Sequence, residues 1–337
     1  MRFLRKFNGL VVGAFLALTL TNAAQAACDG TDQRKSLTAG EREQLSDTVA
    51  NIPFASGNHW RATRNSKVIH LIGTIHLSDA RLGPITERLQ GVVESSQALL
   101  LEMSPKEEEA LKADMASRPE LLFLQDQTLP ELMEEADWQE LSEAVHERGV
   151  PPMLASRFQP WYLSMMLAIP PCLTAELHAE GNKGLDHRLR DIALAAGVPM
   201  QGMEPHDTLF RLFNDEPLAK QIDLMLLSLE TADQSLDQLA TVKAAYYEQN
   251  HAEAWEMSRR AVMQIEGRSQ DELRALFSEW EEDLLILRNQ AWIPVILEAL
   301  DGNRQITVAA GAGHLGGAKG ILALLKAEGF SLERLPF

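Results

Sequence analysis

Four short apolar segments of this sequence each end in a histidine or a glutamate. They are VIHLIGTIH, ALLLE, VPMQGME and ITVAAGAGH, and their last residues are His76, Glu102, Glu204 and His314. Short apolar runs of this kind are typical of buried parallel strands. Because the carboxyl ends of parallel strands lie along one edge of a sheet, where open α/β sheets bind ligands, we expect these four side chains to converge.

The order of the predicted elements indicates the α/β class, with a mixed, largely parallel sheet and helices on both faces. Strands are predicted over 58–63, 67–75, 98–103, 198–203, 305–310 and 331–335, and helices over 80–95, 161–168, 185–196 and 318–328. Since no Ser/Gly-rich linker interrupts the chain, we expect residues 27–337 to form a single domain. Two stretches with helical periodicity, at about 106–180 and 208–301, are predicted to be helical insertions in that domain.

The first 26 residues have the pattern of a secretory signal peptide. Three basic residues precede an apolar run over 9–20, and the tripeptide AQA provides a cleavage site after Ala26. No later segment has the uninterrupted apolar length of a membrane-spanning helix. We therefore expect a periplasmic or secreted protein without a transmembrane anchor in the mature chain.

The charge of the chain argues against a nucleic-acid partner. Removal of the three basic residues of the leader changes the formal net charge from −17 to −20. No cluster of Lys and Arg remains that could bind a row of phosphates. The expected substrate is instead a peptide or a small molecule.

The two cysteines, Cys28 and Cys172, both follow the predicted cleavage site. In an oxidising compartment a disulfide between them is favoured over two free thiols. A lipid-modified Cys28 is the alternative, but Gln25 stands where lipid attachment needs an aliphatic residue.

Two of the four segment ends share the spacing G-x-x-H, in Gly73-Thr-Ile-His76 and Gly311-Ala-Gly-His314. Glycine permits a tight turn and a close approach of the backbone to a ligand, and the histidine then projects over the strand end. The alternative is that either histidine is a hydrogen-bonded structural residue near a helix N-terminus.

The second glycine turn also has a competing interpretation. From Gly311 to Gly316 it reads G-x-G-x-x-G, which resembles a dinucleotide-binding turn with Glu333 as the ribose-binding acid. An exported compartment is poor in nicotinamide cofactors, and only one further strand follows, so we favour the G-x-x-H interpretation.

Glu102 and Glu204 each follow a short apolar segment, which predicts a position at a strand end rather than on a solvated helix face. A buried carboxylate needs a cation or hydrogen-bond donors, so helix capping or a structural salt bridge is the alternative to a functional role. Two histidines and a carboxylate suit Mn²⁺, Fe²⁺, Co²⁺ or Zn²⁺. His76, His314 and Glu102 are therefore candidate metal ligands, and Glu204 is a candidate general base for a bound water.

Arg288 and Asn289 lie in the otherwise apolar helical stretch LLILRNQAWIPVIL. The guanidinium must find an anion, which is either a structural carboxylate or a developing oxyanion. Pro294 in the same stretch predicts a kink or a break of the helix close to these two residues. His187 and His251 have polar helical surroundings and are predicted to lie at the surface.

The order and spacing of these motifs resemble the TraB/PrgY/GumN family, whose bacterial GumN-like members are exported and which is related to the animal Tiki metalloproteases. The resemblance runs through most of the mature chain. It rests on Cys28, Asn58-His-Trp60, Gly73-Thr-Ile-His76-Leu, Leu101-Glu102, Gly184-Leu-Asp186, Gly202-Met-Glu204-Pro, Arg288-Asn289 and Gly311-Ala-Gly-His314-Leu. Met203 departs from the pattern, which has an aliphatic residue such as Leu at that position.

The resemblance implies a fold akin to erythromycin esterases and haem-binding ChaN-like proteins. It implies that His76 and His314 are the metal-related pair, and that Glu102 is a ligand or a base. Arg288 and Asn289 become transition-state or structural partners. Two further acids, Glu204 and Asp186, match positions typical of the family.

The function that we expect is an exported metal-dependent hydrolase, in the first place a peptidase in which Mn²⁺, Co²⁺ or Zn²⁺ activates a water molecule. One alternative is a non-catalytic periplasmic protein that binds haem, a metal or a peptide. Another is an esterase for small molecules at the same site, since one fold can host several activities.

Overall fold

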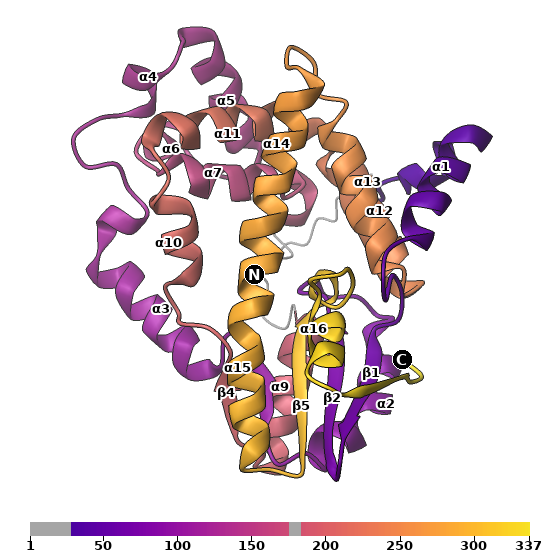
Figure 1. The fold of residues 1–337 in the computed structure, drawn as a ribbon. Helices are drawn as coiled ribbons and strands as arrows, with labels where there is room; N and C mark the ends of the chain where they lie inside the picture. The colour runs from indigo at the N-terminus through magenta and orange to yellow at the C-terminus, as the bar shows by residue number, and fades with distance from the viewer. Residues whose placement is uncertain (1–27, 175–182) are drawn as a thin grey trace, which may run out of the picture.

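The computed structural model describes residues 28–174 and 183–337, and a six-stranded sheet lies at its centre (Figure 1). The strands are β1 (His59–Arg64), β2 (Lys67–Thr74), β3 (Leu99–Leu101), β4 (Met200–Gly202), β5 (Gln305–Gly311) and β6 (Ser331–Arg334). Their order is β4-β3-β5-β2-β1-β6, with parallel pairing from β4 to β2 and antiparallel pairing of β1 with β2 and β6. This mixed, largely parallel sheet confirms the predicted class. The predicted signal peptide lies outside the described residues.

The register of the parallel strands brings the predicted strand ends to one edge of the sheet. Thr74, the last residue of β2, pairs with Gly311, the last residue of β5. Leu101, the last residue of β3, pairs with Gly202, the last residue of β4. The four residues that end the apolar segments follow these positions within three residues; they are His76, Glu102, Glu204 and His314. We call this the strand-end edge.

Helices cover both faces of the sheet (Figure 1). On one face lie α15 (Leu287–Asp301) and α16 (Ile321–Ala327), and on the other lie α2 (Leu82–Glu94) and α9 (Leu185–Ala196). Successive residues of a strand point to opposite faces, so Leu71 packs with the first pair of helices and Ile72 with the second. Burial on both faces explains why the strands are continuous apolar runs.

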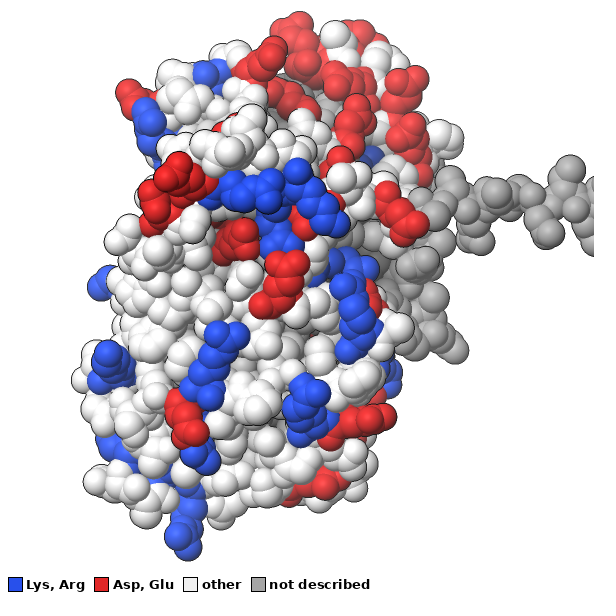
Figure 2. Space-filling view, turned by 90° about the vertical axis from the view of Figure 1, so that its right-hand side faces the viewer, with Lys and Arg blue, Asp and Glu red and all other residues white. Residues whose placement is uncertain are grey.

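The two helical insertions pack against each other beyond the strand-end edge (Figure 1). Their helices are α3 (Pro105–Ser117), α4 (Leu129–Leu132), α5 (Glu135–Glu147), α6 (Pro152–Ala155) and α7 (Pro160–Leu167) from the first, and α10 (Thr208–Asn214), α11 (Leu218–Glu230), α12 (Ser235–Tyr247), α13 (His251–Val262) and α14 (Gln270–Glu281) from the second. Leu141, Leu163 and Met225 join both insertions in one apolar cluster. Figure 2 shows acidic side chains crowded towards the top of one face, the end of the molecule at which the insertions lie.

The helix that carries Arg288 is not broken at Pro294. α15 continues through this proline, and the irregularity is instead the π-helical turn η5 (Glu282–Ile286), which joins α14 to α15. Pro294 cannot donate to the carbonyl of Gln290, but Gln290 is exposed, so water can take that carbonyl. The predicted break is therefore absent, and the irregularity nearest to Arg288 is this π-helical turn rather than a distortion at Pro294.

The N-terminal segment is tied to the first insertion by a disulfide between Cys28 and Cys172. The disulfide confirms the favoured state of the two cysteines. Because the sulfur of Cys28 is bonded to Cys172, it is not available for a lipid. The segment then continues into α1 (Ala39–Ala50), and among the described residues no helix has the length and apolar character needed to cross a membrane.

Candidate active site

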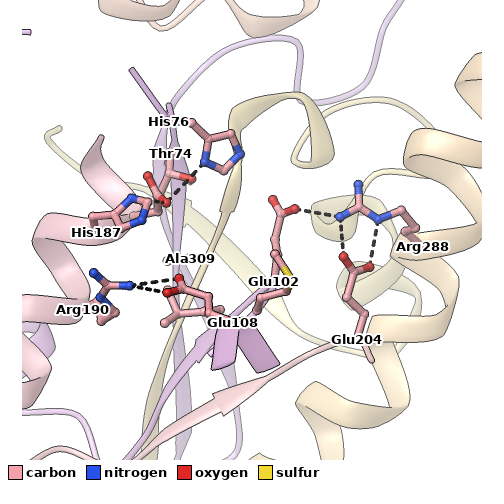
Figure 3. Close-up of a pocket in the computed structure, with 12 residues that line it drawn as sticks. Thr74, His76, Glu102, Glu108, His187, Arg190, Glu204, Arg288 and Ala309 are labelled. Carbon is pink, nitrogen blue, oxygen red and sulfur yellow. Dashed lines mark hydrogen bonds and ion pairs between the residues drawn. The ribbon is translucent and has the colours of Figure 1, made fainter. Parts of the chain in front are cut away.

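Arg288 is the centre of a cluster of charged side chains at the strand-end edge (Figure 3). Its Nη2 donates to Glu102 Oε2 and to Glu204 Oε1, both at 2.7 Å, and its Nε donates to Glu204 Oε2 at 2.9 Å. Its Nη1 donates to the carbonyl of Leu284 at 3.1 Å and lies 3.4 Å from Nε2 of His314. All five N–H groups of the guanidinium therefore face a partner, and the anion expected from the sequence is a pair of carboxylates.

Glu204 is held at both oxygens. In addition to the bonds from Arg288, its Oε2 accepts a hydrogen bond from Nε1 of Trp292 at 3.1 Å, and its side chain is 7% exposed. The lone pairs of Glu204 are thus directed at protein donors rather than at a bound water. This geometry favours a positioning role for Glu204 over the predicted role of general base.

Glu102 divides its oxygens between two partners. Oε2 accepts from Arg288, and Oε1 accepts from the backbone N–H of Gly311 at 2.7 Å. Burial alone would raise the pKa of Glu102, but the adjacent His314 and the Arg288 guanidinium outweigh burial and lower this pKa to about 2. Glu102 is therefore an anion at neutral pH, and its side chain remains 19% exposed towards the pocket.

His314 is oriented by its contact with Asn289. Nδ1 of His314 lies 2.7 Å from Oδ1 of Asn289, and Nδ2 of Asn289 donates to the carbonyl of Lys319 at 3.1 Å. The amide oxygen can only accept, so Nδ1 carries the ring proton and the lone pair of Nε2 faces Nη1 of Arg288 at 3.4 Å. Burial lowers the pKa of His314 to about 4, and the ring is neutral at pH 7. Its Nε2 is 4.0 Å from Oε1 of Glu102.

His76 lies on the other side of the pocket, and its side chain is 66% exposed. Its Nδ1 lies 3.3 Å from Oδ2 of Asp186. The ion pair with Asp186 raises the pKa of His76 above its usual value, although solvent at the exposed ring screens part of this attraction. An added Cβ at Gly184 would lie 2.4 Å from the carbonyl oxygen of Ile75, so only glycine lets the start of α9 approach His76.

The wall on the side of α9 contains residues that the sequence prediction missed. Oδ2 of Asp186 is 2.9 Å from Nδ1 of His187, and Nη1 of Arg190 donates to both oxygens of Glu108 at 2.9 Å. His187 was expected at the surface, but it lines the pocket. Thr74, at the end of β2, also lines it. The sequence contained a signal for this wall, because positions 186, 187 and 190 lie close to one face in the first turns of the predicted helix.

The space between these walls is a pocket of about 300 Å³ (Figure 3). It is lined by Thr74, His76, Leu101, Glu102, Met103, Glu108, Asp186, His187, Arg190, Glu204, Arg288 and Ala309. We call it the strand-end pocket. The predicted residues Glu102, Glu204 and Arg288 share one wall, with His314 and Asn289 behind Arg288, and His76 stands apart from them.

The glycines of the Gly311–Gly316 turn do not form a cradle for a dinucleotide. A Cβ at Gly316 would lie 2.8 Å from Nε2 of His251, so this glycine permits packing of the chain on itself. α16 begins only at Ile321, and Glu333 lies on the exposed edge strand β6. These positions agree with the G-x-x-H interpretation of the turn.

The sequence profile of the TraB/PrgY/gumN family matches residues 58–334. The chain belongs to the TraB/PrgY/gumN family. Among curated proteins, none matches the sequence. The TraB/PrgY/gumN region includes the whole sheet, both insertions and every residue of the strand-end pocket, whereas Cys28 and α1 precede it.

The donors of this TraB/PrgY/gumN site fit a divalent metal in chemical type. His314 and His76 each place Nδ1 against an acceptor oxygen, as metal-bound histidines commonly do. Nε2 of His314 faces Nη1 of Arg288 at 3.4 Å, and His76, whose pKa is raised, would have to release the proton of its other ring nitrogen to bind an ion. The distance between His314 Nε2 and Glu102 Oε1 is 4.0 Å, which is longer than the roughly 3.3 Å between two tetrahedral ligands with bonds of about 2 Å, so this pair would have to move closer to bind one ion. However, the described ranges contain no group of three or more His, Cys, Asp or Glu side chains placed to hold a metal. Glu102 and His76 line the strand-end pocket, whereas His314 is buried and does not line it, so the predicted ligands do not all lie at ligand distance.

Proposed function

We propose that this member of the family is an exported, metal-dependent hydrolase that cleaves peptide bonds in the strand-end pocket. The observation that carries the proposal is the ionised carboxylate of Glu102, 4.0 Å from the unprotonated Nε2 of His314, beside the strand-end pocket. A carboxylate and a neutral imidazole are ligands of hydrolytic metals. Export is supported by the leader-like first 26 residues and by the disulfide.

Glu102 and His314 would hold the ion, and His76 would supply a third donor from the other wall. The ion, for which we propose Mn²⁺, Co²⁺ or Zn²⁺, would act as a Lewis acid and lower the pKa of a bound water. The guanidinium of Arg288 is close, but it is paired with two carboxylates. The cluster of Arg288, Glu102 and Glu204 therefore has a net negative charge and attracts a cation.

The neighbouring residues would position these donors. Arg288 has no unpaired N–H, so its proposed role is to hold Glu102 and Glu204 rather than to bind an oxyanion. Asn289 would orient the ring of His314, and Asp186 would orient that of His76. Such second partners of metal-binding histidines affect metal affinity and activity.

Thr74 is the proposed contact for the substrate carbonyl. Its hydroxyl is buried in the lining of the strand-end pocket and has no hydrogen-bond partner among the described residues. An unpaired buried hydroxyl is costly, and a substrate oxygen would satisfy it. The pocket volume of about 300 Å³ is at the lower end for small-molecule sites, so a short peptide segment or a small ester fits. A small-molecule esterase is thus the second candidate function.

The test uses the chain from residue 27 with a peptide library and, in parallel, a set of small aryl esters. Peptide cleavage that stops with a chelator and returns with Mn²⁺, Co²⁺ or Zn²⁺ supports the peptidase. Metal-dependent cleavage restricted to esters selects the esterase. We expect Glu102→Gln, His314→Ala and His76→Ala to lower kcat/KM by more than about 100-fold.

The matched control is His146→Ala, because His146 is exposed on α5, away from the pocket. This variant is expected to retain full activity. The proposal is wrong if no metal supports cleavage of either substrate class. It is also wrong if the folded variants of Glu102 and His314 cleave as fast as the unmodified chain.

A further inference from the structure

A second cavity lies inside the helical insertions. Its volume is about 310 Å³, and α7, α10, α11, α14 and η5 contribute to its wall. Most of the wall is apolar and includes Trp161, Phe213, Leu224, Leu276 and Trp280. The cavity is partly open to solvent, since Met165 in its wall is exposed, and an apolar pocket of this size is a candidate site for a small molecule.

Four charged side chains line the same cavity. Lys220 pairs with Glu216 at 3.0 Å and also with Glu279. Asp283 makes no hydrogen bond or ion pair with any side chain in residues 28–174 and 183–337. Burial raises the pKa of Asp283, and the charges of Glu279 and Glu216 raise it further, whereas the charge of Lys220 lowers it. The lining therefore carries more negative than positive charge, and its Lys220 forms ion pairs with Glu216 and Glu279 rather than with Asp283.

We propose that this cavity binds a small cationic amphiphile, with its apolar chain among the tryptophan and leucine side chains and its positive head group beside Asp283. The apolar wall disfavours a purely polar ligand, and the excess of carboxylates disfavours an anionic one such as a fatty acid. The volume holds a chain of roughly ten heavy atoms, at about 30 Å³ each. The ligand class is thus an alkyl or aryl ammonium compound.

The cavity is distinct from the strand-end pocket, although one turn of helix connects them. Leu284 lines the cavity, and its carbonyl accepts a hydrogen bond from Nη1 of Arg288 at 3.1 Å. The connecting turn η5 is π-helical, a local geometry that is frequent at functional sites. No lining residue is common to the two pockets, so the proposal does not depend on hydrolytic activity.

The test compares three probes with the same ten-carbon chain, namely decyltrimethylammonium, decanol and decyl sulfate. Binding to the chain from residue 27 is measured by calorimetry below the micelle concentration of each probe. The fluorescence of Trp161 and Trp280, which line the cavity, provides a second signal. We expect decyltrimethylammonium to bind about fivefold more tightly than decanol, and decyl sulfate to bind more weakly than either.

Two variants separate the charge from the volume. Asp283→Asn removes the charge at nearly constant size, so the preference for the cation over decanol should disappear. Ser228→Phe fills the cavity and should abolish the binding of both probes, whereas Leu194→Phe, at a position 71% exposed on α9, should have no effect. Equal affinities for the three probes overturn the proposal. An unchanged preference for the cation in Asp283→Asn also overturns the proposal. The Asp283→Asn variant provides this test even if Ser228→Phe does not fold.

Discussion

Oδ1 of Asn289 lies 2.7 Å from Nδ1 of His314, and this contact fixes which ring nitrogen faces Glu102 and Arg288. Rotation of the Asn289 amide by half a turn would break a hydrogen bond, because its Nδ2 donates to the carbonyl of Lys319. His314 therefore carries its proton on Nδ1 and presents the lone pair of Nε2 towards Glu102. The two neighbours Arg288 and Asn289 thus position a carboxylate and an imidazole from one turn of α15.

Asn289→Ala removes the acceptor for the Nδ1 proton of His314. We expect metal affinity and kcat/KM to fall by about 10- to 100-fold, the usual effect of losing such a partner. Nitrogen NMR of the ring should show that the proton is no longer confined to Nδ1. Asn289→Asp keeps an acceptor oxygen and should keep the proton on Nδ1. An unchanged ring spectrum in Asn289→Ala would count against the positioning role.

Arg288→Met leaves Glu102 and Glu204 close together without their shared cation. Both carboxylates are largely buried, so we expect the free energy of unfolding to fall by about 3 to 5 kcal/mol at pH 7. Urea unfolding measures this loss. The double variant Arg288→Met/Glu204→Gln removes one of the stranded charges and should recover part of it. If the double variant is no more stable than the single one, the guanidinium is not compensating a buried charge on Glu204.

The strand-end edge could be predicted from the sequence because its signal is local. Each strand is a short apolar run, and the parallel register follows from burial on both faces, so Glu102 and His314 necessarily reach the same edge. The Asp186 position was indicated only by the resemblance to the family. The resemblance to a family added Arg288 and Asn289 to the same site.

The partners of these residues could not be predicted, because they depend on how distant elements pack. The sequence allowed either a structural carboxylate or an oxyanion as the partner of Arg288. The structure shows two carboxylates, because α15 packs against the ends of two strands. His251 was predicted at the surface from its polar neighbours, yet it is 5% exposed. Its environment is formed by Phe54 and Asn58, about two hundred positions earlier in the sequence.

Reduction of the disulfide between Cys28 and Cys172 should lower the stability of the chain. The bond closes a loop with a sequence separation of 144 residues, so its loss increases the conformational freedom of the unfolded chain. We expect the free energy of unfolding to fall by about 2 to 4 kcal/mol in dithiothreitol. The variant Cys28→Ser/Cys172→Ser should show the lower stability with and without the reductant. A reductant effect of equal size in this double variant would show that the disulfide is not its origin.

His251 should make the stability of the chain depend on pH. Its ring is buried, and Nε2 donates to the carbonyl of Phe54 at 2.9 Å. Burial lowers the pKa of His251 to about 4 from an ordinary value of 6.5. Between these two values the unfolded chain binds a proton that the folded chain does not, so stability falls as the pH falls from 6.5 towards 4.

Between pH 7 and pH 5 we expect His251 to account for a loss of about 2 kcal/mol in the free energy of unfolding. Urea unfolding at both pH values measures the loss, and His251→Gln, which retains an N–H donor for Phe54, should show a smaller one. His146→Gln changes an exposed histidine and should leave the loss at its full size. An identical pH dependence in the unmodified chain and in His251→Gln would mean that His251 is protonated equally in both states, which its burial forbids.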